Sequence, residues 1–252
     1  MKNKLRFGFG ILCALAALIC GAYLFWYYLG SGETQKHEKI RKEVQTEVTQ
    51  TENTQTSEGA GNPVDFKKLQ EVNPDVCAWI EVPGTQIHYP VVQSLTQEEY
   101  YLDHTWDGKA GAKGAIFIQS YNRKDFTDFN TVIYGHEMGD GTMFNALHNY
   151  MDQDYWNGHQ KVVVYTPGKT RTYQIFASVV YDDRHIMKTF HFTEATDRQK
   201  FLDSLYASRD LRSQYDKTVK VTAEDQIITL STCIGPEPDK RYLVEAVLID
   251  EK

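Results

Sequence analysis

The chain has 252 residues, of which 41% are hydrophobic and 24% charged, so it holds enough apolar material for one ordinary folded domain with appendages. Its 34 Asp and Glu outnumber its 27 Lys and Arg, giving a net charge of −7 at pH 7. An acidic excess works against contacts with phosphate, so we expect no nucleic-acid partner.

An uncharged apolar run occupies residues 7–30 and follows a short basic stretch, residues 1–6. It is long enough for the roughly 20 residues that cross a bilayer as a helix. Lys2, Lys4 and Arg6 precede it, so the positive-inside rule keeps the N-terminus in the cytoplasm. We therefore predict a cytoplasmic N-terminus at 1–6 and a transmembrane signal-anchor at 7–30. The alternative is a cleavable signal peptide, whose apolar region is usually shorter, about 7 to 15 residues.

Residues 31–62 are rich in Glu, Gln and Thr and hold few large apolar side chains. Such a segment cannot bury enough apolar surface to offset the entropy that it would lose on ordering. We predict a polar extracellular stalk at 31–62 and a folded extracellular domain at 63–252. The protein is then expected in the cell membrane, with a single pass.

The chain contains four cysteines, two of which, Cys13 and Cys20, lie within the apolar run. Cys77 and Cys233 remain in the folded domain, too few for a disulfide framework, although one bridge between them is formally possible. We favour two unlinked thiols, one buried and one reactive.

Eight segments of the folded domain have the alternating or apolar pattern of strands, and many are bounded by Gly, Pro or Asn. They are Val76–Glu81, Gln86–Val92, Ala115–Gln119, Asn130–Tyr134, Lys161–Thr166, Thr172–Val180, Gln226–Thr232 and Arg241–Ile249. So many strands with few helices favour a closed or nearly closed barrel, because closure removes exposed sheet edges. We predict a mostly β fold.

Three helices are predicted around these strands: Asp65–Val72, Thr142–Met151 and Thr196–Leu211. The last begins with Thr196 and Gln199, the spacing of a capping box. Its predicted buried residues are Phe201, Leu202 and Leu205.

Cys233 follows an apolar strand and precedes a turn-rich stretch, and Arg241 opens the next predicted strand. If the two strands form a hairpin, the thiol and the guanidinium emerge at the same end of the sheet. A fixed cation favours the thiolate and stabilises the oxyanion that forms when a thiolate attacks a carbonyl. Spacing alone leaves the alternative open that Cys233 is a core thiol and Arg241 a surface charge.

His136 also follows an apolar strand, at a point where the chain becomes polar and rich in glycine. An imidazole can donate a proton to a leaving amine and later accept one from an incoming nucleophile. The chain has 8 histidines, so a position at a strand end does not by itself select this one.

These motifs together resemble the signature of the sortases. Thr229–Cys233 reads Thr-Leu-Ser-Thr-Cys, Arg241 follows it, and Tyr134–His136 lies well upstream. The Ser inside the motif, and the helix before its strand, resemble class B. Further similar segments are Asn73–Ile80, Pro90–Gln93 and Gly141–Phe144. Glu137 and Ile234 depart from the Asn and the acidic residue that class B members often carry there.

The resemblance implies an eight-stranded sortase-type β-barrel with a few peripheral helices, preceded by one N-terminal transmembrane helix. It implies a cysteine transpeptidase in which Cys233 forms a thioester with the Thr of a C-terminal sorting signal, NPxTx or LPxTG-like. His136 would shuttle protons and Arg241 would stabilise the oxyanion. The acyl group would pass to an amine of a lipid-linked peptidoglycan precursor, anchoring a surface protein to the cell wall.

Four neighbouring residues are predicted to bind the substrate. Thr232 and Ser231 adjoin the nucleophile, and since strand alternation turns one of them inward, we favour Thr232. Tyr134 lines the pocket or packs in the core, and the backbone N–H of Ile234 is a candidate second oxyanion donor.

Two other functions remain open from the sequence: a pilin-polymerising or hydrolytic sortase, and a non-enzymatic membrane-anchored binding domain. The intact set of Cys233, His136 and Arg241 argues against the second. The stretch after His136 is not His-Glu-x-x-His, and neither Cys77 nor Cys233 has a second cysteine at ligand spacing. We expect no metal and no cofactor.

Overall fold

The computed structural model describes residues 20–21 and 62–252. The predicted cytoplasmic tail, the stalk up to residue 61 and almost all of the signal-anchor lie outside these ranges. No helix within them has both the length and the apolar character needed to span a bilayer. The signal-anchor at 7–30 therefore stays a prediction.

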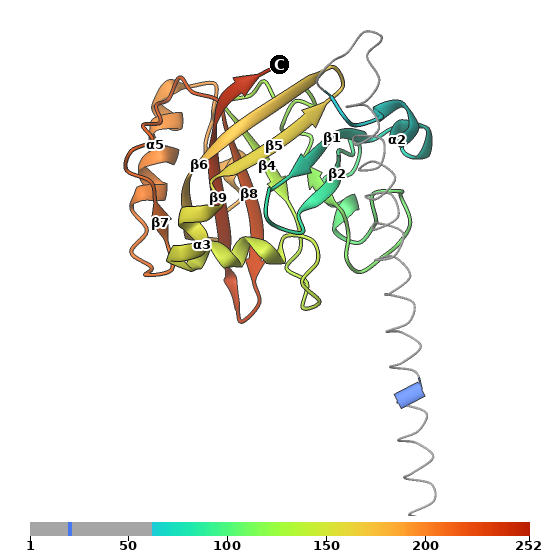
Figure 1. Ribbon diagram of the computed structural model, residues 1–252, viewed down its shortest axis with the longest axis horizontal. Coiled ribbons are helices and arrows are strands. Elements are labelled where there is room, and N and C mark those ends of the chain that lie inside the picture. Colours follow the sequence, from blue (N-terminus) through green and yellow to red (C-terminus); the bar gives the residue numbers. More distant parts are fainter. Residues whose placement is uncertain (1–19, 22–61) are drawn as a thin grey trace, which may run out of the picture. The chain divides into compact units, whose positions relative to one another are not determined.

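A sheet in the order β5-β1-β2-β3-β4-β8-β9-β6-β7 forms the domain, and a further pairing between β5 and β6 closes eight strands into a barrel (Figure 1). The short strand β7 is attached to β6 beyond the closure. Two neighbours, β2–β3 and β4–β8, run parallel, and the others are antiparallel. The strands are β1 Val76–Glu81, β2 His88–Val92, β3 Ile116–Ile118, β4 Asn130–Tyr134, β5 Lys161–Thr166, β6 Lys169–Asp182, β7 Gln214–Tyr215, β8 Ile227–Ile234 and β9 Glu237–Glu251. The predicted eight-stranded barrel is confirmed.

The largest difference from the predicted strands is at the hairpin between β8 and β9. The stretch before Arg241 was expected to be a turn, but β8 continues to Ile234 and β9 already begins at Glu237. Only Gly235 and Pro236 form the turn. Polar residues at an exposed hairpin tip give no apolar alternation, so their strand pairing left no pattern to detect.

Short helices surround the barrel: α2 Phe66–Val72, η1 Tyr100–Leu102, η2 Asn145–Met151, α3 Gln153–Gly158, α4 Ile186–Thr189 and α5 Ala195–Tyr206. The helix predicted at Thr142–Met151 is the shorter 3₁₀ segment η2. The predicted capping box is wrong, because α5 begins after Glu194 and its N-cap makes no side-chain hydrogen bond. Figure 1 shows α5 beside β7 on one side of the barrel, and α2 beside β1 and β2 on the other.

Two apolar clusters lie on opposite faces of the barrel wall. The first draws residues from all eight barrel strands and so fills the barrel interior, with Ile133, Ile228 and Tyr242 among its members. The second lies outside the wall, where α4 and α5 cover β4, β6, β8 and β9. Phe201, Leu202 and Leu205 of α5 are buried there, as predicted. Each central strand therefore has an inner and an outer face, and this decides which side chains can reach a substrate.

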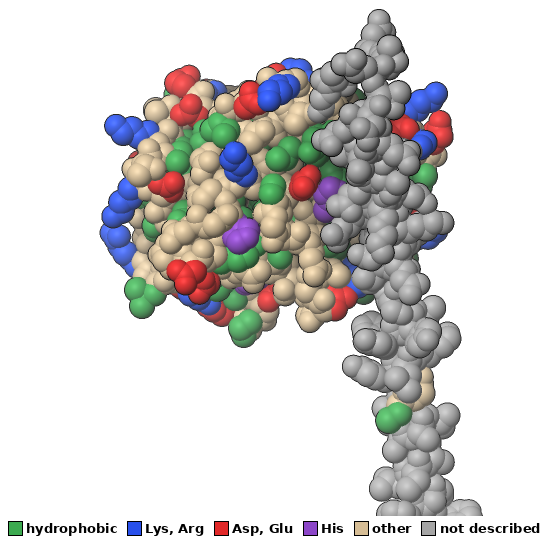
Figure 2. Space-filling model, in the orientation of Figure 1, with side chains coloured by type: hydrophobic (Ala, Val, Ile, Leu, Met, Phe, Trp, Pro, Cys, Tyr) green, Lys and Arg blue, Asp and Glu red, His purple; other side chains and the backbone are tan. Residues whose placement is uncertain are grey.

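The charged surface is mixed in sign. On the face shown in Figure 2, basic and acidic side chains are interspersed over the domain.

Candidate active site

Of the three predicted reactive residues, Cys233 and Arg241 lie on the adjacent strands β8 and β9, and His136 follows the end of β4, which is paired with β8. Strand β8 lies in the middle. On one side Cys233 is the direct cross-strand partner of Arg241, which confirms the predicted hairpin. On the other side Tyr134 is paired in parallel with Ser231, and the Gly135 N–H donates to the Ser231 carbonyl at 3.1 Å. His136 and Cys233 each follow this last pair by two residues, so the chain after β4 starts next to the part of β8 that carries Cys233.

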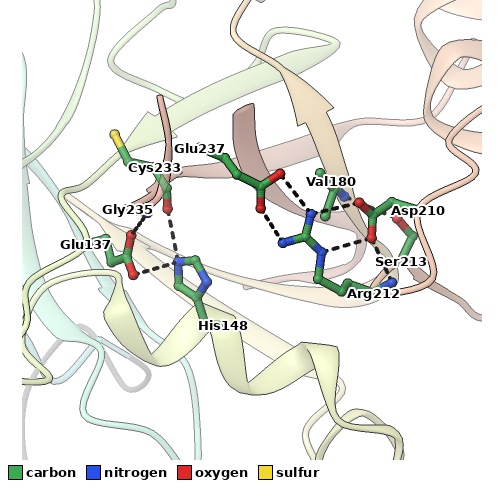
Figure 3. A network of polar contacts seen from close by, with 9 residues as sticks. All are labelled: Glu137, His148, Val180, Asp210, Arg212, Ser213, Cys233, Gly235 and Glu237. Carbon is green, nitrogen blue, oxygen red and sulfur yellow. Dashed lines mark hydrogen bonds and ion pairs between the residues drawn. The ribbon is translucent and has the colours of Figure 1, made fainter. Parts of the chain in front are cut away.

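The Cys233 thiol emerges on the outer face of the barrel wall. Ile228 and Leu230 of β8 belong to the interior cluster, so odd-numbered positions of this strand face outward. Cys233 is exposed, and Figure 3 shows its sulfur directed away from the polar side chains behind the strand. The nucleophile therefore stands on the side that α4 and α5 partly cover.

The second thiol of the domain has a different environment. Cys77 is buried, and desolvation raises the pKa of its thiol to about 12. Its S–H donates to the Val91 carbonyl at 3.5 Å. Neither Cys77 nor Cys233 is in a disulfide, and one is buried and the other exposed, as predicted, while the reactivity of Cys233 stays a prediction.

The His136 ring is fixed by one hydrogen bond to the backbone. Its Nε2 lies 2.7 Å from the carbonyl oxygen of Leu102. A carbonyl only accepts, so Nε2 carries the proton of this bond. If His136 acts as the predicted proton shuttle, Nδ1 is the ring nitrogen that this bond leaves for a substrate.

The Arg241 guanidinium is oriented by the start of its own strand. Its Nη1 donates to the carbonyls of Pro238 at 2.9 Å and of Lys240 at 2.8 Å. Among the described residues no carboxylate forms an ion pair with it. Its positive charge is thus available to an anion that develops beside Cys233.

The comparisons with known proteins agree with this geometry. A family model described as "Sortase domain" matches residues 80–249. The chain belongs to the sortase family. It is 35% identical over 191 residues to Sortase B of Listeria monocytogenes, a match that covers 75% of this chain and 73% of that protein. It is 33% identical over 190 residues to Sortase B of Staphylococcus aureus, covering 73% of this chain and 74% of that protein.

Solved sortase structures share the fold. The structure titled "Staphylococcus aureus sortase B-substrate complex" matches with a TM-score of 0.73 at 28% identity, over 87% of this chain and 97% of that chain. The Clostridium perfringens sortase B structure matches with a TM-score of 0.66 at 30% identity, over 74% of this chain and 100% of that chain. The chain is therefore a sortase B-like cysteine transpeptidase, as the motifs predicted.

Of the two residues before the sortase nucleophile, Ser231 and not Thr232 shares its face. Thr232 is paired with Tyr242, a member of the interior cluster, and its buried Oγ1 has no hydrogen-bond partner among the described residues. Ser231 is two residues from Cys233 and is paired with Leu243 of the outer cluster. The expectation that Thr232 faces the site is wrong, because in a strand residues 231 and 233 share one face and residue 232 lies on the other.

Tyr134 and Ile234 take different positions around the thiol. Tyr134 packs partly buried against the outer cluster, and its ring is stacked on Phe117 at 5.4 Å. Burial raises the pKa of its hydroxyl, while the nearby charge of Arg241 acts to lower that pKa. Tyr134 therefore lies close to the guanidinium on the reactive side. The Ile234 side chain is in the barrel interior, so only its backbone belongs to the site.

A hollow of about 770 Å³ lies next to His136 and is open to solvent. Leu102, whose carbonyl holds the His136 ring, is one of its lining residues. The hollow is lined by Thr96, Gln97, Glu98, Glu99, Tyr100, Leu102, Asp103 and His104. Its lining is mainly polar and acidic.

Two polar networks behind the nucleophile strand were not predicted (Figure 3). In the first, Arg212 donates from Nη1 to Glu237 at 2.6 Å and from Nε to Asp210 at 2.9 Å. The hydrogen bond from Arg212 lowers the pKa of Asp210 to about 2. This network fixes the first residue of β9 to the chain before β7. The second joins Glu137 and His148 to the peptides around Ile234. Neither network has a sequence signature, since its members are far apart in the chain.

No group of three or more His, Cys, Asp or Glu in the part of the chain that the structure describes could hold a metal ion.

Proposed function

We propose that this sortase cleaves a C-terminal sorting signal after its Thr residue and transfers the new carboxyl end to an amine. The observation that carries the proposal is the register of three strands: Cys233 is paired with Arg241, and the β4–β8 pairing ends at Tyr134 and Ser231, each two residues before His136 and Cys233. In one acyl transfer, the exposed thiol of Cys233 is the nucleophile and the imidazole of His136 carries the proton. The guanidinium of Arg241 stabilises the anion.

The first half-reaction forms the acyl-enzyme. The Cys233 thiolate attacks the carbonyl carbon of the Thr residue, and the electron pair of the C=O bond moves to oxygen. The Arg241 guanidinium, with the N–H of Ile234 as a second donor, stabilises this oxyanion. Collapse of the intermediate breaks the C–N bond, and His136 gives its proton to the departing amine. A thioester remains on Cys233.

The second half-reaction transfers the acyl group. An incoming amine gives a proton to His136 and attacks the thioester carbonyl. A second oxyanion forms at the same place, and its collapse breaks the C–S bond and releases the Cys233 thiolate. The product is an amide, and the enzyme returns to its starting protonation state.

For the substrates, we propose an NPxTx or LPxTG-like signal and an amino group of a lipid-linked peptidoglycan precursor. One related structure is titled a "sortase B-substrate complex", and another is a crystal structure of Sortase B complexed with triglycine. The second supports an amine at the end of a short peptide as the acceptor. Ser231 and Tyr134 would contact the signal, since both lie on the face of the thiol.

We further propose that residues 7–30 anchor the chain in the cell membrane with the domain outside. The support is the length of the apolar run and the basic residues before it. Fusion of residues 1–62 to a reporter protein, followed by membrane fractionation and protease shaving of intact cells, tests this. Reporter found in the soluble fraction would contradict an anchor.

The decisive test of the reaction uses the folded domain, NPxTx and LPxTG peptides, and triglycine, with products identified by mass spectrometry. Wild type should form the triglycine amide, and Cys233→Ala should form none. Cys77→Ala is the matched control, because it removes the other thiol of the domain from a buried site. If Cys233→Ala turned over every peptide as wild type does, the proposal would be wrong.

The same assay separates the other acceptors. Replacing triglycine by a peptide with a lysine side chain tests pilin-type polymerisation, and omitting the amine measures hydrolysis. A clear preference for lysine or for water over triglycine would replace the proposed acceptor while leaving the roles of Cys233 and His136 intact.

A further inference from the structure

The hydrogen-bond ladder between β4 and β8 stops two residues before Cys233. Its last bond runs from the Gly135 N–H to the Ser231 carbonyl. Carbonyls two residues apart on a strand point to the same neighbour, so the Cys233 carbonyl also points toward β4, beyond the end of that strand. His148 takes this place, and its Nε2 donates to the Cys233 carbonyl at 3.0 Å.

A carboxylate holds the next peptide along the chain. Oε2 of Glu137 accepts the Gly235 N–H at 2.6 Å, and Oε1 of the same group lies 3.8 Å from His148 Nε2. Figure 3 shows both side chains on one side of β8, with the Cys233 sulfur on the other. Hydrogen bonds to a charged acceptor are stronger than neutral ones. The two side chains thus hold the peptides on both sides of Ile234.

The segment that carries these side chains is itself well fixed. The Phe144 N–H donates to the His136 carbonyl at 3.0 Å, and the Met143 N–H donates to the Tyr89 hydroxyl at 3.0 Å. Met143 has a φ of 58°, a strained value that a non-glycine residue keeps only where its surroundings enforce it. The His148 ring is stacked on Tyr242 of β9 at 5.4 Å.

Fixing the Cys233 carbonyl also fixes the Ile234 N–H, because both belong to one planar peptide unit. Cys233 is paired with Arg241 and Ile234 with Glu237, so the register of β8 against β9 shifts within this peptide unit and its pairing is irregular. We propose that His148 and Glu137 are positioning residues that set the orientation of this peptide, and so of the backbone donor to the oxyanion. The inference rests on the proposed roles of Cys233 and Ile234 in the reaction.

The test compares His148→Phe, His148→Gln and His159→Phe with wild type in the peptide assay. Phe keeps a ring to stack on Tyr242 but cannot donate, whereas Gln restores a donor. His159 is the matched control, since its ring stacks on Tyr155 at 3.9 Å and its Nδ1 bonds the Tyr155 carbonyl at 2.9 Å, away from β8.

We expect His148→Phe to lower kcat about 10-fold, the rate equivalent of one lost hydrogen bond, with KM unchanged. His148→Gln should recover most of kcat, and His159→Phe should keep the wild-type value. An unchanged kcat in His148→Phe would overturn the proposal. So would an equal loss in His148→Gln, or a loss in His159→Phe of the same size.

A second measurement does not depend on turnover. Amide hydrogen exchange at Gly235, followed by NMR, should be about 10-fold faster in Glu137→Leu and close to wild type in Glu137→Gln, which keeps an acceptor oxygen. Equal exchange in wild type and Glu137→Leu would remove Glu137 from this role. If wild type processed no peptide, the proposed function would fail, and the exchange rates would still decide whether Glu137 holds this turn.

Discussion

The buried carboxyl of Glu245 should make the stability of the domain fall as the pH rises from about 5 to 8. Glu245 is on β9, fully buried, and paired across the strands with Thr229. The Thr229 hydroxyl donates to its Oε2 at 2.9 Å, and the Asn130 amide donates to that hydroxyl at 2.9 Å. Burial raises the pKa of Glu245 from 4.5 to about 8, against the smaller opposite effect of Thr229.

The sign of the effect follows from proton binding. Between 4.5 and about 8 the folded state keeps the Glu245 proton and the unfolded state has lost it. The stability that protonation provides is complete below 4.5 and is lost as the pH rises through about 8. The free energy of unfolding should therefore fall by about 1.4 kcal/mol per pH unit, or about 4 kcal/mol between about pH 5 and 8.

Urea unfolding at about pH 5, 6, 7 and 8 measures this slope in wild type and Glu245→Gln. The amide has nearly the shape of the protonated acid and does not titrate, so the difference between the two proteins should change with pH by the slope given above. Glu224→Gln, at an exposed site, is the control and should run parallel to wild type. Parallel curves for wild type and Glu245→Gln would refute a protonated Glu245 in the core.

Three further outcomes are expected. Arg241→Lys should lower kcat/KM for the sorting peptide at least about 10-fold, because an ammonium cannot reproduce two planar donors; near-normal turnover would take Arg241 out of the oxyanion site. Ser231→Ala should raise the peptide KM. Thr232→Val should leave turnover unchanged and keep or slightly raise the melting temperature, because the Thr232 hydroxyl is buried without a partner among the described residues. A raised KM in Thr232→Val and an unchanged KM in Ser231→Ala would put Thr232 at the substrate. Arg212→Met should destabilise the domain by only about 1 kcal/mol in thermal unfolding, because the side chains of Arg212 and Glu237 are about one-third exposed and water weakens their ion pair. An unchanged melting temperature would show that the ion pairs of Arg212 contribute nothing to stability.

The strands could largely be predicted because their pattern is local. Strands β1, β4 and β5 have the predicted bounds, and the turn between β8 and β9 is shorter than expected. The two-residue strand β7 was missed, because two residues are too few to show a period. The number of strands predicts that the sheet closes into a barrel. It does not predict that β5 and β6 are the strands whose pairing closes it.

For the site, the sequence by itself predicted the reactive set and one contact within it. The spacing of Cys233 and Arg241 indicated a hairpin that brings the two residues together, and they are cross-strand partners. Only the tertiary structure decided that the face shared by Ser231 and Cys233 is the outer one, and that Glu137 and His148 hold the peptides on both sides of Ile234. Alternation sets which residues share a face but not which face is inside. Contacts between residues about 100 positions apart depend on how the barrel closes, and no local pattern records that.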